Sequence, residues 1–303
     1  MRIQSLCLLL SVMIFQQANA QDSSLLKMMN DSMSAHPHTD YVTGTFKAMY
    51  IVNMQTVEGP ARGALNFEIQ HRFGKLNDGA YNFFGLDNAT LRLGLDYGLT
   101  DRLVIGIGRS SFLKTFDGYL KYKLIRQGAS GGSPFTVSLL GTIDNYTQQD
   151  ATKPYLDATY RTSYTVQALI ARKMSRTLSI EITPTYLHFN LVPGIADKND
   201  VFAIPVGARM KISKRMSINA EYDYMPDNQL VSVTRHNSFS LGWDIETGGH
   251  VFQLIFTNSQ SMLTSQYVAQ TPGNWGNGDI YFGFNISRAF NISKRAKGKV
   301  AQP

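Results

Sequence analysis

The sequence predicts an all-β protein, a transmembrane antiparallel up-and-down β-barrel of about twelve strands. Three observations support this fold class. Apolar and polar residues alternate in successive runs from Leu65 to Phe290, and a period of two places them on opposite faces of β-strands. Each run is close to the roughly 9–11 residues that a tilted membrane strand needs. The connections alternate between short turns and long loops, as they do in outer-membrane barrels.

The clearest strand pair spans residues 88–111, with a turn at residues 98–101. Its apolar face would meet a second sheet in a soluble sandwich, or lipid in a membrane barrel. The alternation of short and long connections favours the barrel, because a sandwich has no reason to keep it. We therefore expect these apolar residues to face lipid: Leu91, Leu93, Leu95, Leu103, Ile105 and Ile107. Arg92 and Asp96 should face the lumen.

The other expected elements follow from the same alternation. From the first to the last of its main apolar residues, each run covers residues 65–73, 89–97, 103–107, 120–124, 135–143, 164–170, 178–186, 202–210, 216–224, 239–245, 252–256 and 280–290. Short connections lie near residues 99, 128, 173, 213 and 248, and long ones begin at residues 74, 112, 144, 190, 226 and 259. Pro184 and Pro205 fall inside two runs. Each proline removes a hydrogen bond from the ladder, so we expect bulges there.

One further alternating run, at residues 45–53, does not fit this arrangement, because it would make the strand number odd. It crosses the lumen, covers a rim of the barrel or completes a strand pairing. The sequence does not distinguish these three placements.

The chain divides into four expected parts. Residues 1–20 have the features of a secretory signal peptide, with Arg2, a short apolar core and the cleavage pattern Ala18-Asn19-Ala20. Residues 21–43 form a polar, mobile segment, residues 44–290 form the barrel, and residues 291–303 form a basic tail. We expect export to the outer membrane.

Composition limits the functions that the chain can have. Its 303 residues carry a net charge of +7, much of it in the basic tail. In an exported protein such a tail suits solvent or acidic lipid head groups, and we expect no nucleic-acid partner. No stretch after the signal is apolar for long enough to form a transmembrane helix. Cys7, the single cysteine, lies in the signal, which excludes disulfides, thiolate metal sites and attached haem. We expect no cofactor.

The charged residues on the predicted inner face form the candidate site. They are Glu68, Arg72, Arg92, Asp96, Lys121, Lys123, Glu181, Arg209, Lys211, Glu221, Asp223, Asp244 and Glu246. Acidic and basic groups are mixed. Such a lumen is either a polar channel that orients a solute or a lumen plugged by ion pairs, and a barrel of about twelve strands allows both.

Histidine and serine residues give weaker signals. His36 and His38 have a metal-like spacing but lie in the mobile segment, so we predict no metal site. Ser238 and His236 are the one close serine–histidine pair, and a hydrolase triad also needs an orienting acid. We predict no catalytic residues.

A resemblance to a known family rests on four stretches. They are VEGPARG (residues 57–63), LNFEIQHRFG (65–74), YNFFGLDNATLRLGLDYGLTDRLVIGIGRSSF (81–112) and DGYLKYKL (117–124). These stretches resemble an uncharacterised family of Bacteroidota outer-membrane β-barrels, domain of unknown function 5777. In the first stretch Ala61-Arg62-Gly63 stands where the family has glycine-lysine-glycine. The resemblance implies an outer-membrane barrel and no particular activity.

Three functional hypotheses remain from the sequence. The first is a narrow passive channel or a structural barrel in contact with outer-membrane lipid. The second is an accessory or binding barrel for a periplasmic protein partner, such as an electron carrier. The third is a lipid-acting barrel hydrolase that uses Ser238 and His236.

Overall fold

The computed structural model describes residues 27–28 and 40–293. The predicted signal peptide, His36, His38 and the tail after Ser293 lie outside the described residues. Among the residues that are described, no helix is long and apolar enough to cross a membrane. The described chain forms two units. In the smaller one, Tyr41 forms an antiparallel bridge with Gly128, and the carbonyl of Asp40 accepts a hydrogen bond from the Ala129 N–H.

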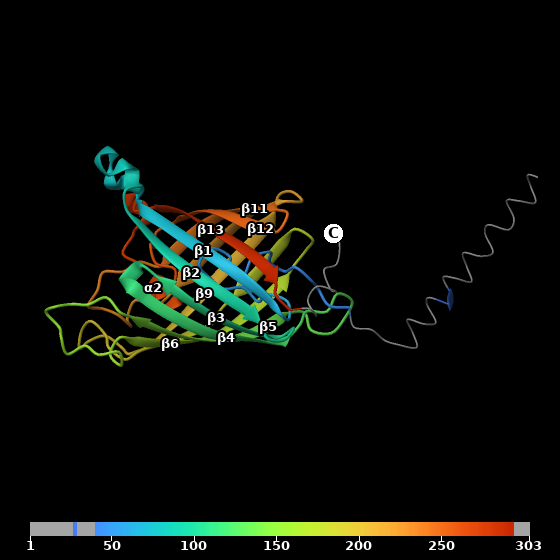
Figure 1. The fold of residues 1–303 in the computed structure, drawn as a ribbon, viewed down its shortest axis with the longest axis horizontal. Coiled ribbons are helices and arrows are strands. Elements are labelled where there is room, and N and C mark those ends of the chain that lie inside the picture. The colour runs from blue at the N-terminus through green and yellow to red at the C-terminus, as the bar shows by residue number, and fades with distance from the viewer. Residues whose placement is uncertain (1–26, 29–39, 294–303) are drawn as a thin grey trace, which may run out of the picture. The chain divides into compact units, whose positions relative to one another are not determined.

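The larger unit is a β-barrel (Figure 1). Its strands are β1 (Ala64–Lys75), β2 (Ala89–Gly98), β3 (Leu103–Ser110), β4 (Thr115–Ile125), β5 (Thr136–Tyr146), β6 (Thr162–Lys173), β7 (Leu178–Ile182), β8 (Thr185–Phe189), β9 (Asp200–Lys211), β10 (Met216–Tyr224), β11 (Ser238–Thr247), β12 (His250–Thr257) and β13 (Tyr281–Asn291). The short helices are η1 (Leu76–Asp78), η2 (Ala80–Gly85), η3 (Phe112–Lys114), α2 (Thr264–Ala269) and η4 (Trp275–Asn277).

The sheet closes on itself through consecutive antiparallel pairs and through the pairing of β1 with β13. β7 and β8 each pair with β6 on one side and β9 on the other. They are two segments that share one strand position between β6 and β9, so the thirteen strands occupy twelve positions around the barrel. The structure thus confirms the predicted all-β barrel and the predicted strand number.

The interruption between β7 and β8 falls at Thr183 and Pro184. The carbonyl of Pro184 still accepts from the Ala168 N–H at 3.0 Å, and the Thr183 N–H donates to the carbonyl of Pro205 at 2.8 Å. β9 continues through Pro205, which faces Asp223 of β10. Pro184 therefore interrupts its strand, while the backbone groups on either side of it stay paired.

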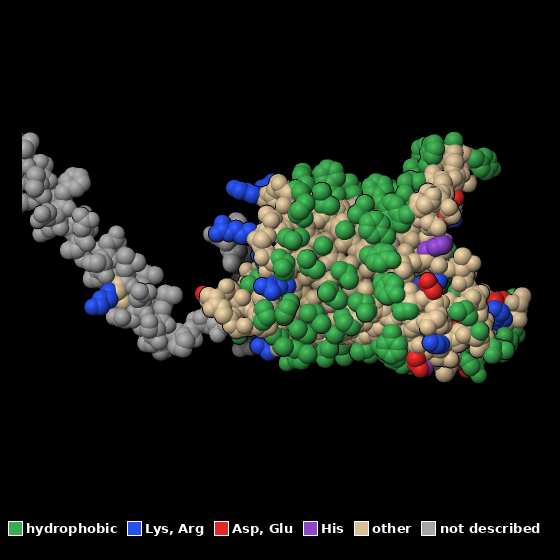
Figure 2. Space-filling model, turned by 180° about the vertical axis from the view of Figure 1, so that it is seen from behind, with side chains coloured by type: hydrophobic (Ala, Val, Ile, Leu, Met, Phe, Trp, Pro, Cys, Tyr) green, Lys and Arg blue, Asp and Glu red, His purple; other side chains and the backbone are tan. Residues whose placement is uncertain are grey.

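Burial alternates along the strands as the sequence predicts. In β2 and β3, Leu93, Leu95, Ile105 and Ile107 are exposed on the outer surface, whereas the side chains between them point inward. Figure 2 shows apolar side chains covering the middle of the barrel wall, with Lys and Arg at one end and a mixture of Lys, Arg, Asp, Glu and His at the other. The outer surface therefore presents the apolar band that a lipid bilayer requires.

The two ends of the barrel differ. At the short-turn end lie the β2–β3, β4–β5, β6–β7, β9–β10 and β11–β12 connections; at the long-loop end lie the other six. Figure 1 shows the longer loops together at the end opposite the C-terminus label. Two predicted loop boundaries were wrong, because β4 already begins at Thr115 and β5 runs on to Tyr146. β13 likewise ends at Asn291, inside the predicted tail.

Candidate functional site

The charged residues predicted for the lumen lie on the inner faces of their strands. Lys123, Lys211 and Glu246 are partly exposed. The other ten are buried: Glu68, Arg72, Arg92, Asp96, Lys121, Glu181, Arg209, Glu221, Asp223 and Asp244. Charges buried this deeply need partners. For most of them the structure supplies partners, partly from the wall and partly from chain segments inside the lumen.

Arg92 on β2 makes the strongest ion pair of the inner wall. Its guanidinium binds Asp117 of β4 through two nitrogens, with Nε 3.0 Å from Oδ1, and both side chains are almost fully buried. Asp96 accepts from the hydroxyl of Tyr119 at 2.6 Å. Asp117 was absent from the predicted set, because the loop expected at residues 112–118 included the first residues of strand β4. This bidentate ion pair joins β2 to β4 across the inner face of β3, which lies between them.

Residues 45–57 fold as a hairpin inside the lumen, and we call this segment the hairpin plug. Its tip is a tight turn in which the Ile51 N–H donates to the Met54 carbonyl at 2.9 Å. One arm enters at the short-turn end, where the Val42 N–H binds the Gln127 carbonyl, and the other returns there to join β1. Of the three placements that the sequence allowed, the structure shows the segment within the lumen.

Glu221 of β10 holds the tip of the hairpin plug. Its carboxylate accepts hydrogen bonds from three successive backbone N–H groups, those of Val52, Asn53 and Met54, at 2.9–3.1 Å. Arg72 donates to the side chain of Asn53 at 2.8 Å. A carboxylate bound by several backbone donors satisfies groups that would otherwise be buried without partners.

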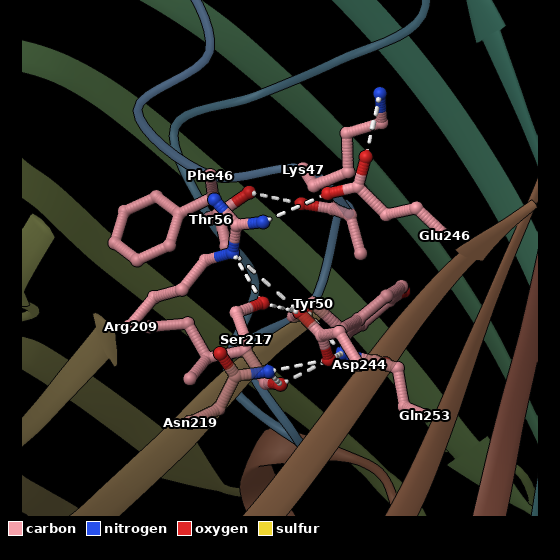
Figure 3. A network of polar contacts seen from close by, with 12 residues as sticks. Phe46, Lys47, Tyr50, Thr56, Arg209, Ser217, Asn219, Asp244, Glu246 and Gln253 are labelled. Carbon is pink, nitrogen blue, oxygen red and sulfur yellow. Dashed lines mark hydrogen bonds and ion pairs between the residues drawn. The ribbon is translucent and has the colours of Figure 1, made fainter. Parts of the chain in front are cut away.

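Amide and charged side chains of the wall bind further backbone groups of the plug, and Figure 3 shows two of them, Gln253 and Asn219. Gln253 and Asn219 donate to the Ile51 carbonyl at 2.9 and 3.2 Å. Lys121 Nζ donates to the Thr56 carbonyl at 2.9 Å, and the Val57 N–H donates to Glu181 at 3.0 Å. Charged residues predicted for a channel wall therefore serve as ligands for a segment of the chain itself.

Further ion pairs lie closer to the short-turn end of the plug. Glu246 accepts from Lys47 of the plug at 3.2 Å and from Arg209 of β9 at 2.9 Å. Figure 3 shows Glu246 lying between these two cations. Arg209 also donates to Ser217, which in turn donates to Asp244, both at 2.9 Å. This network links the plug to strands β9, β10 and β11.

Apolar residues of the wall complete the seat of the hairpin plug. Phe46, Met49, Ile51 and Val52 belong to one buried cluster with inward-facing wall residues. These wall residues are Val104, Tyr119, Leu140, Leu169, Ala171 and Ile255. Apolar side chains on the inner face of a polar lumen would be unfavourable in water, and their burial under the plug removes that cost.

Gly207 of β9 leaves room for the plug. A Cβ added there would stand 2.4 Å from Cδ1 of Ile51. We predict that Gly207→Leu destabilises the protein by about 1–3 kcal/mol, because the extra volume must displace the plug. The free energy of unfolding in urea measures this change. Gly141→Leu is the matched control, since nothing lies within 4 Å of a Cβ at Gly141. Equal losses in the two variants would contradict this account.

A second segment, residues 259–271 between β12 and β13, enters the lumen from the long-loop end; we call it the loop plug. It carries α2. Ser265 donates to Asp144 of β5 at 2.8 Å, and Gln266 donates to Thr115 of β4 at 2.9 Å. On its other side the loop plug packs in a buried apolar cluster of Leu187, Phe189, Val201, Ala203, Met225, Leu230, Tyr267, Val268 and Ala269. The loop plug therefore contacts the wall from β4 and β5 to β8 and β9.

Asp279 fastens the chain where it returns from the loop plug to β13. A hydrogen bond from the Asn77 side chain, one from the Asn274 N–H and one from Lys75 together lower the pKa of Asp279 to about 2. A carboxylate with a lowered pKa stabilises the fold above the unfolded-state pKa of about 4, and this contribution is lost as the pH falls towards 2.

We predict that Asp279→Asn loses less stability than the native protein when the pH falls from about 4 to about 2. Unfolding midpoints measured across this range test it, with Asp101→Asn on an exposed short turn as control.

The residues considered for catalysis do not form a site. Ser238 is fully buried on the inner face of β11, where it lies opposite Asp223 of β10. His236 lies in the preceding loop, where its backbone N–H donates to the Thr271 carbonyl. No hydrogen bond joins the two side chains within the described part of the chain. In the same part, no cluster of three or more His, Cys, Asp or Glu could hold a metal ion.

Solved structures with a similar fold are outer-membrane proteins of low sequence identity. The KdgM porin matches at 7% identity and a TM-score of 0.45, over 75% of this chain and 99% of that one. An outer-membrane channel from Pseudomonas putida F1 matches at 14% and 0.43, over 77% and 97%. Outer membrane phospholipase A from Escherichia coli matches at 10% and 0.41, over 80% and 95%. Likeness at this level concerns the fold alone.

No curated protein matches the sequence. The family model of a membrane-bound β-barrel domain, DUF5777, matches residues 46–290. The match covers the barrel wall together with the hairpin plug and the loop plug. The chain therefore belongs to the DUF5777 family of membrane-bound β-barrel domains and is an outer-membrane β-barrel.

Proposed function

We propose that this protein is a structural, non-enzymatic outer-membrane barrel whose lumen is closed at rest, rather than an open passive channel. The single observation that carries the proposal is the binding of the tip of the hairpin plug by Glu221. Three backbone N–H groups of the plug are bound by one buried carboxylate. Inside the barrel this arrangement satisfies both the buried carboxylate and the buried backbone of the turn.

The energetics of the inner wall support a closed resting state. Leu140, Leu169 and Ile255 are almost fully buried on the inner face. Withdrawal of the plug would expose them to water at a cost of about 1.5–3 kcal/mol for each side chain. The loop plug blocks the lumen at another depth with its own apolar cluster. In an open channel these apolar side chains would line a water-filled lumen, which is unfavourable.

Liposome swelling tests the proposal. The full-length chain is reconstituted into liposomes, which are then diluted into isotonic arabinose. We expect swelling no faster than that of empty liposomes, while a known open porin swells rapidly. A swelling rate that exceeds the empty control and falls with increasing sugar size would overturn the proposal and favour a narrow channel.

A further inference from the structure

The long-loop end of the barrel holds a cavity that plays no part in closing the lumen. Its volume is about 600 Å³, within the range of small-molecule binding sites. Its walls come from the loops that follow β5, β8 and β10, and α2 lies at its base. Long loops of outer-membrane barrels face the outside of the cell. The cavity is therefore accessible to molecules from outside.

Asp144 provides an acidic group in this cavity. Its side chain is 5% exposed, and Oδ2 accepts a hydrogen bond from the hydroxyl of Ser265 at 2.8 Å. Oδ1 has no hydrogen-bond partner among the described residues. A carboxylate that is this buried and only half satisfied is costly, unless a ligand or water supplies the missing donor.

Gln266 provides a second acceptor without a donor. Its Nε2 donates to the hydroxyl oxygen of Thr115 at 2.9 Å, and that hydroxyl itself donates to the Phe112 carbonyl at 2.9 Å. Because the Thr115 hydroxyl has already used its proton, the amide nitrogen of Gln266 must face it. The orientation of the amide is thereby fixed, and Oε1 is enclosed without a hydrogen-bond partner among the described residues.

The chemistry of these two groups defines what the base of the cavity can bind. Both present acceptors that lack a donor among the described residues, and the carboxyl group of Asp144 carries a negative charge when it is ionised. An ammonium group has three N–H donors and the complementary charge. A carboxylate or phosphate has neither, and would be repelled by Asp144.

The walls of the cavity suit an apolar body. Tyr155, Tyr160, Phe189, Leu191 and Leu230 line it. Aromatic side chains bury apolar surface, and their ring faces also attract cations. Lys153 also lines the cavity; it is half exposed, and its Nζ lies 3.9 Å from a carboxylate oxygen of Asp150 in the same loop. Asp150 therefore balances its charge.

We propose that this cavity is a binding site for small amphipathic amines from outside the cell. The ammonium group binds Asp144 at the base, and the apolar body packs against the tyrosine and leucine side chains of the walls. The site is separate from the hairpin plug, and binding does not require the lumen to be closed or open.

Three indole compounds test the proposal, because they share one apolar body and differ in the head group. They are tryptamine, with an ammonium; tryptophol, with a hydroxyl; and indole-3-propionate, with a carboxylate. Binding to the full-length protein in nanodiscs is measured by calorimetry, with empty nanodiscs as the blank. We expect tryptamine to bind at least about tenfold more tightly than indole-3-propionate, with tryptophol between them.

Three single-residue variants test whether tryptamine binds in this cavity. Asp144→Asn should abolish the preference for tryptamine, while Asp150→Asn, which removes an exposed carboxylate from the same loop, should change it by less than about twofold. Tyr155→Ala should weaken tryptamine and tryptophol alike by about tenfold. Tyr155 is 68% exposed, so this variant keeps the fold.

Several results would overturn the proposal. These are no measurable binding of tryptamine, equal affinity for tryptamine and indole-3-propionate, or a preference that persists in Asp144→Asn. If Asp144→Asn does not fold, the head-group series on the native protein and Tyr155→Ala decide the question. An unchanged tryptamine affinity in Tyr155→Ala would then count against the cavity.

Discussion

Replacing Glu221 by glutamine is expected to release the hairpin plug from its seat. Glutamine has nearly the same shape, but it replaces a charged acceptor with an amide whose NH₂ group would face backbone N–H donors. Hydrogen bonds to a charged group contribute about 1.5–3 kcal/mol each, and Glu221 accepts them from three residues. We expect the free energy of plug docking to fall by about 3 kcal/mol or more.

Cysteine labelling at the tip of the plug measures this release. Cys7 is the only cysteine of the sequence and lies in the predicted signal peptide, so Met54→Cys provides a single reporter. Met54 is almost fully buried, and its labelling by a maleimide requires local opening. Because each 1.4 kcal/mol is a factor of ten, Glu221→Gln should accelerate labelling by about a hundredfold.

Asp223→Asn is the matched control for this experiment. Asp223 is buried on the same face of the same strand, two positions further on, and makes no hydrogen bond to the plug. Its amide variant should leave the labelling rate close to that of the native protein. Slow labelling in Glu221→Gln, or equally fast labelling in Asp223→Asn, would show that Glu221 does not anchor the plug.

Opening the lumen is expected to require removal of both plugs. We consider one variant with residues 45–57 replaced by a flexible linker, one with residues 260–270 replaced by a short turn, and one with both changes. Each plug has its own apolar cluster and its own partners on the wall. Either one therefore blocks the lumen when the other is gone, and the two effects on permeability should be far from additive.

Liposome swelling in arabinose tests this expectation. Each single variant should stay near the rate of empty liposomes, and the double variant should swell roughly tenfold faster, because a twelve-stranded barrel emptied of both segments encloses water. A variant with a similar shortening of the exposed β5–β6 loop controls for loop removal alone. A single variant that passes arabinose as fast as the double variant would contradict the account.

The barrel wall could be predicted from the sequence because each strand has one apolar face and one polar face. Leu93, Leu95, Ile105 and Ile107 are exposed outside as expected, and Arg92 is buried inside. The period of two is a local property, so it needs no knowledge of what the strand will pair with. Charged residues on the inner face follow from the same alternation.

The plugs could not be predicted, because they depend on contacts between segments far apart in the chain. Residues 45–53 alternate like a strand, yet the backbone of residues 50–53 bonds to side chains of β10, β12 and β13 rather than pairing with a strand of the wall. A signal was present in the wall. Leu140 and Leu169 are apolar residues at inner positions, and such positions in a polar lumen indicate that something covers them.

Asp117 and Asp144 were missed for a different reason. Both lie at the long-loop ends of their strands, where polar residues dominate and alternation no longer marks the boundary. The sequence assigned them to loops, whereas β4 and β5 place them on the inner face. One then pairs with Arg92 and the other lines the outer cavity.

The central claim is that the native lumen is closed, and single-channel recording of the purified full-length protein in a planar bilayer tests it most directly. Because contacts with the wall hold the hairpin plug and the loop plug inside the lumen, we expect no stepwise current across the range of voltages that the bilayer withstands. Stable, uniform conductance steps from the native protein would contradict the account.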